Sequence, residues 1–214
     1  MKEITIIITD DHHLVREAWS LILNNNSQFK VIAECGSGEE AIEKAKDLRP
    51  NVVIMDINLP GINGIEATEK IRKYSPASKI LAISSHAHPS YARKMMQKGA
   101  FGYITKTSSC EEMFKAIREV NAGKRYICNE IKNILSGQLL NDREPNGINC
   151  LSCREIEIIE FVKKGNTSKE IASLLNVSIK TIEAHRYNIL KKLNLKNTMS
   201  LIHFIHNSQV SFIN

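Results

Sequence analysis

The chain has 214 residues, which suits one large domain or two small ones. Its 43% hydrophobic and 24% charged residues are typical of a globular protein that folds in water. No apolar run approaches the length of a membrane span, and Lys2 and Glu3 lead into an apolar stretch too short for a signal peptide. These features argue against a membrane protein or a secreted one, and we expect a cytoplasmic protein.

Charge and cysteine content narrow the function further. The net charge is +6, and residues 151–214 hold nine lysine and arginine residues against five acids, so most of the excess lies in the last third. This bias favours a polyanionic partner, although a solvated basic surface would give the same count. The cysteines form an odd, dispersed set that suits neither a disulfide framework nor, for Cys150 and Cys153, a complete zinc site, so we interpret them as reduced thiols.

Strand and helix patterns alternate over roughly the first 120 residues. Short apolar runs that end in turn signals predict five strands, at residues 4–9, 31–33, 52–56, 79–84 and 101–105. Helical spacing predicts helices over about 13–25, 38–49, 64–74, 89–98 and 110–121. The first helix is predicted from the spacing of Leu14, Ala18, Leu21 and Ile22. The last is predicted to begin at a capping box formed by Ser109 and Glu112. This alternation predicts an α/β fold, a doubly wound five-stranded parallel sheet.

The last third is helical throughout. Ser152 with Glu155 and Thr167 with Glu170 form capping boxes, and the apolar spacing predicts helices over 153–164, 168–175, 179–193 and 198–206. A short helix, a tight turn and a longer basic helix make a helix-turn-helix pattern. We expect a first domain over 1–124, a partly helical linker over 125–148 with a breaker-rich stretch at 141–147, and a small all-α four-helix domain over 149–214.

Polar side chains follow the predicted strands at one edge of the sheet, namely Asp10, Asp11, Asp56, Ser84 and Lys106. In open α/β sheets this edge, at the carboxyl ends of the strands, is where ligands bind. Each residue alone has an ordinary explanation, since Asp10 could cap a helix, Asp56 could cap a turn and Lys106 could be solvated. Together the acids favour a Mg²⁺ site, and the lysine and hydroxyl favour a phosphoryl group on Asp56 as nucleophile.

These residues lie in motifs that resemble a response-regulator receiver domain over residues 1–122. The motifs are Asp10-Asp11-His12, Asp56-x-x-Leu-Pro-Gly61-x-x-Gly64, Ile80-Leu-Ala-Ile-Ser84 and Gly99-Ala-x-Gly-Tyr103-x-x-Lys106. The resemblance implies that a sensor histidine kinase phosphorylates Asp56. It also implies that Mg²⁺ or Mn²⁺ is bound by the side chains of Asp11 and Asp56 and the carbonyl of Asn58, with Asp10 acting through water.

The same resemblance assigns roles beside the phosphoryl group. Ser84 and Lys106 would contact it, and Tyr103 would be the aromatic whose rotamer follows phosphorylation; a half-buried strand aromatic is the alternative for Tyr103. Asn58 and His86 would flank the path of hydrolytic water, and we expect them to affect how long the phosphoryl group lasts. The chain departs from many relatives at His13, where they have proline, which concerns helix entry and not chemistry.

The helix predicted over 179–193 has two distinct faces. Its apolar face contains Ile179, Ile182, Ile189, Leu190 and Leu193. The opposite face contains Lys180, Glu183, Ala184, Tyr187, Asn188 and Lys191. Such a face can enter a major groove, with the lysines on phosphates and Glu183, Ala184 and Tyr187 at base edges. His185 lies at the border, and Arg186 falls within the apolar arc, where it could reach a phosphate or pair with an acid on a neighbouring helix.

The last third also resembles the LuxR-type helix-turn-helix. The motifs are Leu151-Ser-x-Arg-Glu155, Gly165-x-Thr-Ser-Lys-Glu-Ile-Ala172, Val177-Ser-x-x-Thr-Ile-Glu-x-His185-Arg and Asn188-Ile-x-x-Lys-Leu193. With the receiver, the chain resembles the NarL/FixJ family of response regulators, which implies that Lys169 and Thr181 touch the DNA backbone. We expect a homodimer on paired half-sites, with the last helix contributing Leu201, Ile202, Phe204 and Ile205 to dimerisation.

The expected function is phosphorylation-controlled, sequence-specific regulation of transcription. The expected partners are a sensor histidine kinase, double-stranded DNA and RNA polymerase, with no membrane contact. One alternative is a phosphorylation-independent DNA binder with a vestigial receiver, against which the intact acid set argues. A phosphatase with an aspartyl nucleophile is the other, but it needs a second acid two residues after the nucleophile, where this chain has Asn58. We therefore expect no enzyme beyond the receiver's own phosphotransfer and dephosphorylation.

Overall fold

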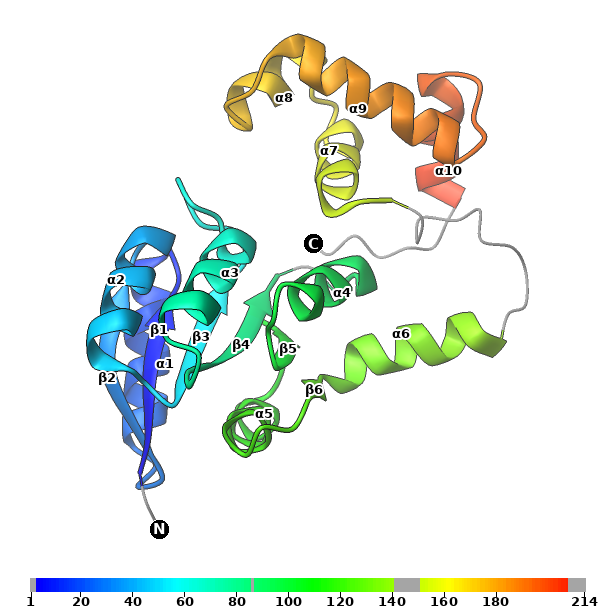
Figure 1. Cartoon of the computed structure of the whole chain (residues 1–214). Coiled ribbons are helices and arrows are strands. Elements are labelled where there is room, and N and C mark those ends of the chain that lie inside the picture. Colours follow the sequence, from blue (N-terminus) through cyan, green and yellow to red (C-terminus); the bar gives the residue numbers. More distant parts are fainter. Residues whose placement is uncertain (1–2, 86, 141–150, 208–214) are drawn as a thin grey trace. The chain divides into compact units, whose positions relative to one another are not determined.

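The computed structural model of the chain describes residues 3–85, 87–140 and 151–207 (Figure 1). His86 and the breaker-rich stretch 141–147 lie outside the described residues. The chain forms two compact units that divide between Ser136 and Gly137, within the segment expected to be the linker. Within the described residues, no helix combines the length and apolar character that crossing a membrane requires.

The first unit alternates strands and helices along the chain. Its strands are β1 (Ile4–Thr9), β2 (Phe29–Cys35), β3 (Val52–Asp56), β4 (Lys79–Ser84), β5 (Gly102–Thr105) and β6 (Tyr126–Ile127). Its helices are α1 (His13–Asn24), α2 (Gly38–Leu48), α3 (Gly64–Tyr74), α4 (Pro89–Gln97) and α5 (Cys110–Asn121), followed by α6 (Asn129–Leu140). The strands form one sheet in the order β2-β1-β3-β4-β5-β6, and every neighbouring pair is parallel. The expected doubly wound parallel fold is therefore confirmed.

The sheet is covered on both faces. Helix α3 packs against α2 and α4 in one layer. Helices α1 and α5 lie together on the other face, where Trp19 and Met113 line one cavity. Because β3 is central and covered on both sides, all of its residues are buried, which explains why its sequence is a continuous apolar run ending in Asp56.

The sheet has six strands where the sequence predicts five. Strand β6 pairs with β5, so that Tyr126 lies beside Gly102 and Ile127 beside Tyr103. The amide of Tyr126 donates to the carbonyl of Phe101 at 2.9 Å, and that of Cys128 donates to the carbonyl of Tyr103 at 2.9 Å. A two-residue strand carries no periodicity of its own, and it forms because the edge of β5 offers backbone groups that need partners.

Helix α1 forms as expected, but part of its apolar spacing faces solvent. Leu14 is 78% exposed and Leu21 65% exposed, whereas Leu23 is fully buried. Trp19 and Ile22 are half-buried and line the cavity beneath the helix. The helix therefore contacts the sheet through a face rotated away from Leu14 and Leu21, because an amphipathic pattern gives the period of a helix but not which of two apolar stripes is covered.

Helices are the regular elements of the second unit among its described residues, as expected. Its helices are α7 (Cys153–Lys163), α8 (Ser168–Leu174), α9 (Ile179–Lys192) and α10 (Thr198–Asn207). Ser152 and Thr167 each form a capping box with the glutamate three residues later, so both predicted capping boxes are confirmed. The core residues come from every helix and include Ile156, Ile159, Ile171, Ile182, Ile189 and Leu201.

Candidate functional site

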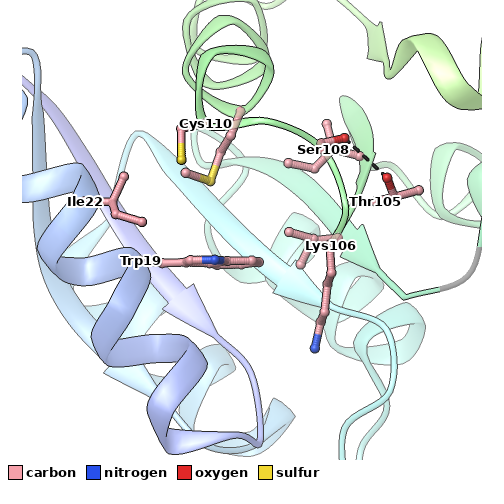
Figure 2. A pocket seen from close by; sticks show the side chains of 9 residues that line it. Trp19, Ile22, Thr105, Lys106, Ser108 and Cys110 are labelled. Carbon is pink, nitrogen blue, oxygen red and sulfur yellow. Dashed lines mark hydrogen bonds between the residues drawn. The ribbon is translucent and has the colours of Figure 1, made fainter. Parts of the chain in front are cut away.

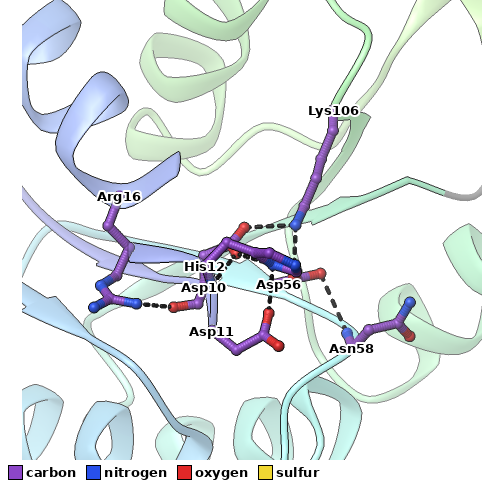
Figure 3. A network of polar contacts seen from close by, with 7 residues as sticks. All are labelled: Asp10, Asp11, His12, Arg16, Asp56, Asn58 and Lys106. Carbon is purple, nitrogen blue, oxygen red and sulfur yellow. Dashed lines mark hydrogen bonds and ion pairs between the residues drawn. The ribbon is translucent and has the colours of Figure 1, made fainter. Parts of the chain in front are cut away.

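The ends of four neighbouring strands bring the predicted polar side chains together (Figure 3). Asp10 follows β1, Asp56 ends β3, Ser84 ends β4 and Lys106 follows β5. Asp10 and Ser84 are fully buried, and Asp56 is only 2% exposed. The amide of Lys106 donates to the carbonyl of Ser84 at 2.8 Å, which holds the end of β5 against that of β4. The parallel topology thus converts positions far apart in the sequence into one pocket.

Lys106 is shared by two buried carboxylates. Its Nζ lies 2.6 Å from Oδ2 of Asp10 and 2.7 Å from Oδ2 of Asp56 (Figure 3). Burial raises the pKa of Asp56 above its ordinary value, against the lowering effect of Lys106. Burial lowers the pKa of Lys106, but the two carboxylates outweigh burial and raise it. One cation thus balances two acids, and a second positive charge would be favourable here.

The donor set at this pocket suits a hard divalent cation. The ligand atoms of Asp10, Asp11 and His12 all lie within 4.8 Å of one another. Oδ2 of Asp10 is buried against Nζ of Lys106, whereas the carboxylate of Asp11 is half-exposed. Clustered carboxylate oxygens that leave room for water are what Mg²⁺ or Mn²⁺ binds. The residues present therefore fit such an ion.

The loop after β3 is packed tightly around Asp56. A Cβ on Gly64, the first residue of α3, would overlap the backbone carbonyl of Asp56, so only glycine allows this approach. Asn58 is exposed, and its backbone amide donates to Oδ1 of Asp56 at 3.2 Å. Asn63 caps α3 by accepting from the amide of Glu66. The loop thereby holds one Asp56 oxygen while Lys106 contacts the other.

Tyr103 is completely buried on β5. It lies beside Ala82 of β4 and Ile127 of β6 in the sheet register. The sixth strand therefore covers the edge on which this aromatic lies.

A small cavity of about 40 Å³ lies between α1 and α5, lined by Trp19, Ile22, Cys110 and the residues around Lys106 (Figure 2). Figure 2 shows the amino group of Lys106 pointing away from Cys110. A space of this size is far smaller than the roughly 300–1,000 Å³ of a site for a drug-sized molecule. The cavity therefore adds no site of that kind to the carboxylate pocket.

Helix α9 presents the predicted polar face to solvent. Lys180, Thr181, Glu183, Ala184 and Lys191 are exposed, as is Lys169 on α8. Tyr187 is 67% exposed, so its ring is accessible to a partner on this face. His185 is half-buried, in keeping with its place at the border of the two faces. Ile179, placed on the apolar face by its spacing, is 45% exposed because it lies in the first turn, outside the packed core.

Comparison with known proteins identifies both units. The family described as "Response regulator receiver domain" matches residues 6–118, and the family described as "Bacterial regulatory proteins, luxR family" matches residues 149–205. Oxygen regulatory protein NreC of Staphylococcus epidermidis is 37% identical over 207 residues, covering 93% of this chain and 95% of NreC. The chain belongs to the NarL/FixJ family of response regulators.

Other relatives match between 65% and 96% of this response regulator. Response regulator UvrY of Escherichia coli K12 is 35% identical over 201 residues, covering 94% of this chain and 92% of UvrY. A LuxR-family two-component response regulator from Aurantimonas sp. SI85-9A1 has a TM-score of 0.62 at 33% identity, covering 65% of this chain and 100% of that one. RcsB of Salmonella enterica serovar Typhimurium, bound to promoter rprA with BeF3-, has a TM-score of 0.68 at 22% identity, covering 96% and 100% of the two chains, and shows the shared fold alone.

Arg186 of the response regulator is used within the helix-turn-helix unit. Its Nη1 donates to the Ser168 hydroxyl at 3.1 Å and its Nη2 to the Thr198 hydroxyl at 3.3 Å. The side chain thus joins the first residues of α8 and α10 to α9. Its partners are hydroxyl groups and not an acid on a neighbouring helix, which was one of the two contacts considered from the sequence. A DNA contact from Arg186 stays a prediction.

Replacement of Arg186 by alanine should lower the free energy of unfolding by about 1 to 3 kcal/mol, because two hydrogen bonds from a charged donor are lost. Thermal and urea unfolding of the full chain measure the effect. Lys191→Ala, an exposed position on the same helix, is the matched control and should change stability by about 0.5 kcal/mol or less. Equal stability of both variants, with DNA binding weakened by Arg186→Ala, would instead assign the guanidinium to a phosphate.

Helix α10 divides the residues expected to support dimerisation. Leu201 is 1% exposed and Ile205 is 4% exposed, so both side chains belong to the core of their own unit and are not available to a second chain. Ile202 is 36% exposed, Phe204 is half-buried, and the neighbouring Met199, which the sequence analysis did not include, is 73% exposed. Residues three and four apart lie on the same face of a helix, so Leu201 and Ile205 face the core together. Of these residues, only Met199, Ile202 and Phe204 are left to contact a second chain.

Two side chains beside the pocket, those of Arg16 and His12, have contacts that the sequence did not predict. Nη1 of Arg16 on α1 donates to the carbonyl of Asp10 at 2.6 Å, which fixes the turn that carries the acids (Figure 3). Nδ1 of His12 lies 2.8 Å from Oδ1 of Asp11 and 3.2 Å from Oδ1 of Asp10. In the sequence, these contacts could have been predicted from the position of Arg16 one turn into α1 and of His12 directly after the two acids.

Proposed function

We propose that a sensor histidine kinase phosphorylates this response regulator on Asp56 in a Mg²⁺- or Mn²⁺-dependent reaction. A carboxylate oxygen of Asp56 attacks the phosphorus of a phosphohistidine, an O–P bond forms, the N–P bond breaks, and the imidazole leaves. The observation that carries the proposal is the pair of buried acids, Asp10 and Asp56, whose side chains both contact the amino group of Lys106. Nothing in an ordinary structural pocket requires that concentration of negative charge.

The proposed roles of the neighbouring residues follow from their positions. The side chains of Asp11 and Asp56 and the carbonyl of Asn58 would hold the ion, with Asp10 acting through water. When bound, the ion neutralises charge on the phosphoryl oxygens. The phosphoryl group itself carries a charge of about −2, so Lys106 turns from the carboxylates toward it, while the Ser84 hydroxyl donates a hydrogen bond. The rotamer of Tyr103 on β5 would then change with phosphorylation.

The second step of the proposal is DNA binding. In the proposed organisation, residues 1–124 receive the signal, 125–148 link, and 149–214 bind DNA as one half of a homodimer. Lys169, Lys180, Thr181 and Lys191 would contact the backbone, and Glu183, Ala184 and Tyr187, with the half-buried His185, would lie near base edges. RNA polymerase is the expected further partner, and the cytoplasm the expected compartment. Ile202, Met199 and Phe204 of α10 provide the remaining apolar surface for a dimer.

The alternatives make different predictions. A vestigial receiver would bind DNA equally well with and without phosphorylation. An aspartyl-nucleophile phosphatase would turn over a phosphomonoester, but the second position after Asp56 is Asn58, whose amide cannot act as a general acid. The acid pair around Lys106 argues against the first alternative, and Asn58 argues against the second.

Selection of bound sequences from a random pool of double-stranded DNA tests the proposal. The full chain is used unphosphorylated and after treatment with a small phosphodonor and Mg²⁺. We expect enrichment of one paired half-site, stronger after phosphorylation, because a dimer places two copies of α9 about one helical turn apart. Identical enrichment under both conditions would favour the vestigial receiver, and no enrichment at all would refute sequence-specific binding.

A further inference from the structure

The first turn of α6 is hydrogen-bonded to the loop that carries Lys106. One carboxylate oxygen of Glu130, in the first turn of α6, accepts from the Thr105 hydroxyl at 2.8 Å and from the Thr107 hydroxyl at 3.3 Å. Thr105 is only 1% exposed whereas Glu130 is exposed, so the hydrogen bond between them is partly buried. The two threonines directly flank Lys106 in the sequence.

The loop therefore lies between the pocket and α6. Residues 105–108 form a turn in which the amide of Ser108 donates to the carbonyl of Thr105 at 3.0 Å. From this turn the hydroxyls of Thr105 and Thr107 contact Glu130, while the amino group of Lys106 contacts Asp10 and Asp56. A displacement of the Lys106 backbone must therefore shift the hydroxyls that hold Glu130, or strain these hydrogen bonds.

A second acid, Glu112 on α5, also binds the segment between β6 and the start of α6. Glu112 was expected to complete a capping box with Ser109, but its Oε1 instead accepts from the amide of Asn129 at 2.8 Å and from the Tyr126 hydroxyl at 3.3 Å. Ser109 still accepts from the amide of Glu112. Burial, together with the charge of Glu112, raises the pKa of Tyr126 to about 12, so its hydroxyl stays a donor. Ile131 on α6 is fully buried, which anchors the segment further.

We propose that Glu130 is a positioning residue that couples the Lys106 loop to β6 and the start of α6, so that phosphorylation of Asp56 is transmitted to the segment leading toward the DNA-binding unit. The inference rests on the proposed function of Asp56. When Lys106 turns to the phosphoryl group, the Thr105 and Thr107 hydroxyls move with their backbone and change the hold on α6. The same hydrogen bonds also hold the backbone on either side of Lys106, so their loss should change the position of its amino group at the phosphoryl group and with it the lifetime of the acyl phosphate.

The test compares the full-length wild type with Glu130→Ala, Glu130→Gln and Asn133→Ala. Glutamine keeps an acceptor oxygen, and Asn133 is an exposed residue on the same helix. Each protein is phosphorylated with a small phosphodonor and Mg²⁺. Hydrogen exchange of the amides in 126–136 is measured before and after, and the decay of the acyl phosphate is followed on phosphate-affinity gels.

In the wild type and Asn133→Ala, exchange in 126–136 should change by about fivefold or more on phosphorylation. In Glu130→Ala this difference should disappear and the acyl-phosphate half-life should change by roughly threefold or more, while Glu130→Gln retains most of both properties. The inference is overturned if wild-type exchange is unaffected by phosphorylation, or if Glu130→Ala matches Asn133→Ala in both measurements. Absence of acyl phosphate in the wild type is a separate result that refutes the proposed function, and this inference with it.

Discussion

Replacement of Asp56 by asparagine should abolish acyl-phosphate formation by this response regulator. An amide has no carboxylate oxygen to attack phosphorus, and no other residue of the pocket replaces it, since Asp10 follows a different strand and is held by Lys106 and Arg16. Incubation with a small phosphodonor and Mg²⁺, followed by phosphate-affinity electrophoresis, measures the product. We expect the wild type to be shifted and the variant to stay at background.

Asp47→Asn, an exposed acid at the end of α2, controls for a general loss of charge and should be phosphorylated like the wild type. Chelation of divalent ions should reduce phosphorylation of the wild type, because the acids of the pocket are then left to repel the incoming phosphoryl group. Persistent acyl phosphate in Asp56→Asn would place the nucleophile elsewhere.

Substitutions on the exposed face of α9 should separate affinity from sequence preference. Lys180→Ala and Lys191→Ala should weaken binding to all DNA sequences and reduce the slope of log affinity against log salt by about one each, because each loses a phosphate contact. Glu183→Ala and Tyr187→Ala should instead relax the preference at particular base pairs, by about 1 to 3 kcal/mol per position. Binding to the selected site and to single-base variants of it, over a range of salt concentrations, measures both effects.

Lys164→Ala is the charge-matched control, since it removes an exposed lysine from the end of α7 and not from α9. It should change neither base preference nor, to any large extent, the salt dependence. If Glu183→Ala bound every sequence variant with an unchanged rank order, the carboxylate would have no part in readout. If all four α9 variants behaved like Lys164→Ala, another surface of the unit would contact DNA.

Arg186 and Tyr187 illustrate how adjacent residues on α9 differ. The projection of the helix correctly put Tyr187 outside and Arg186 toward the core, because helical period is a local property of the chain. It could not identify the partners of Arg186, because Ser168 and Thr198 belong to other helices and are brought close only by packing.

Local chemistry also determined most of the element boundaries. The runs that end at Asp56 and Ser84, and the caps at Ser152 and Thr167, depend on neighbours in the sequence, and the structure reproduces them. From the order of the strands, the sequence by itself placed Asp10, Asp56, Ser84 and Lys106 at one sheet edge. Only the tertiary structure decided that Lys106 contacts both acids, that Leu14 faces solvent, that β6 adds to the sheet, and that Glu112 and Glu130 hold α6. Those outcomes depend on which strand edge stays open and which side chains meet across it, and such long-range contacts leave no period or spacing in the chain.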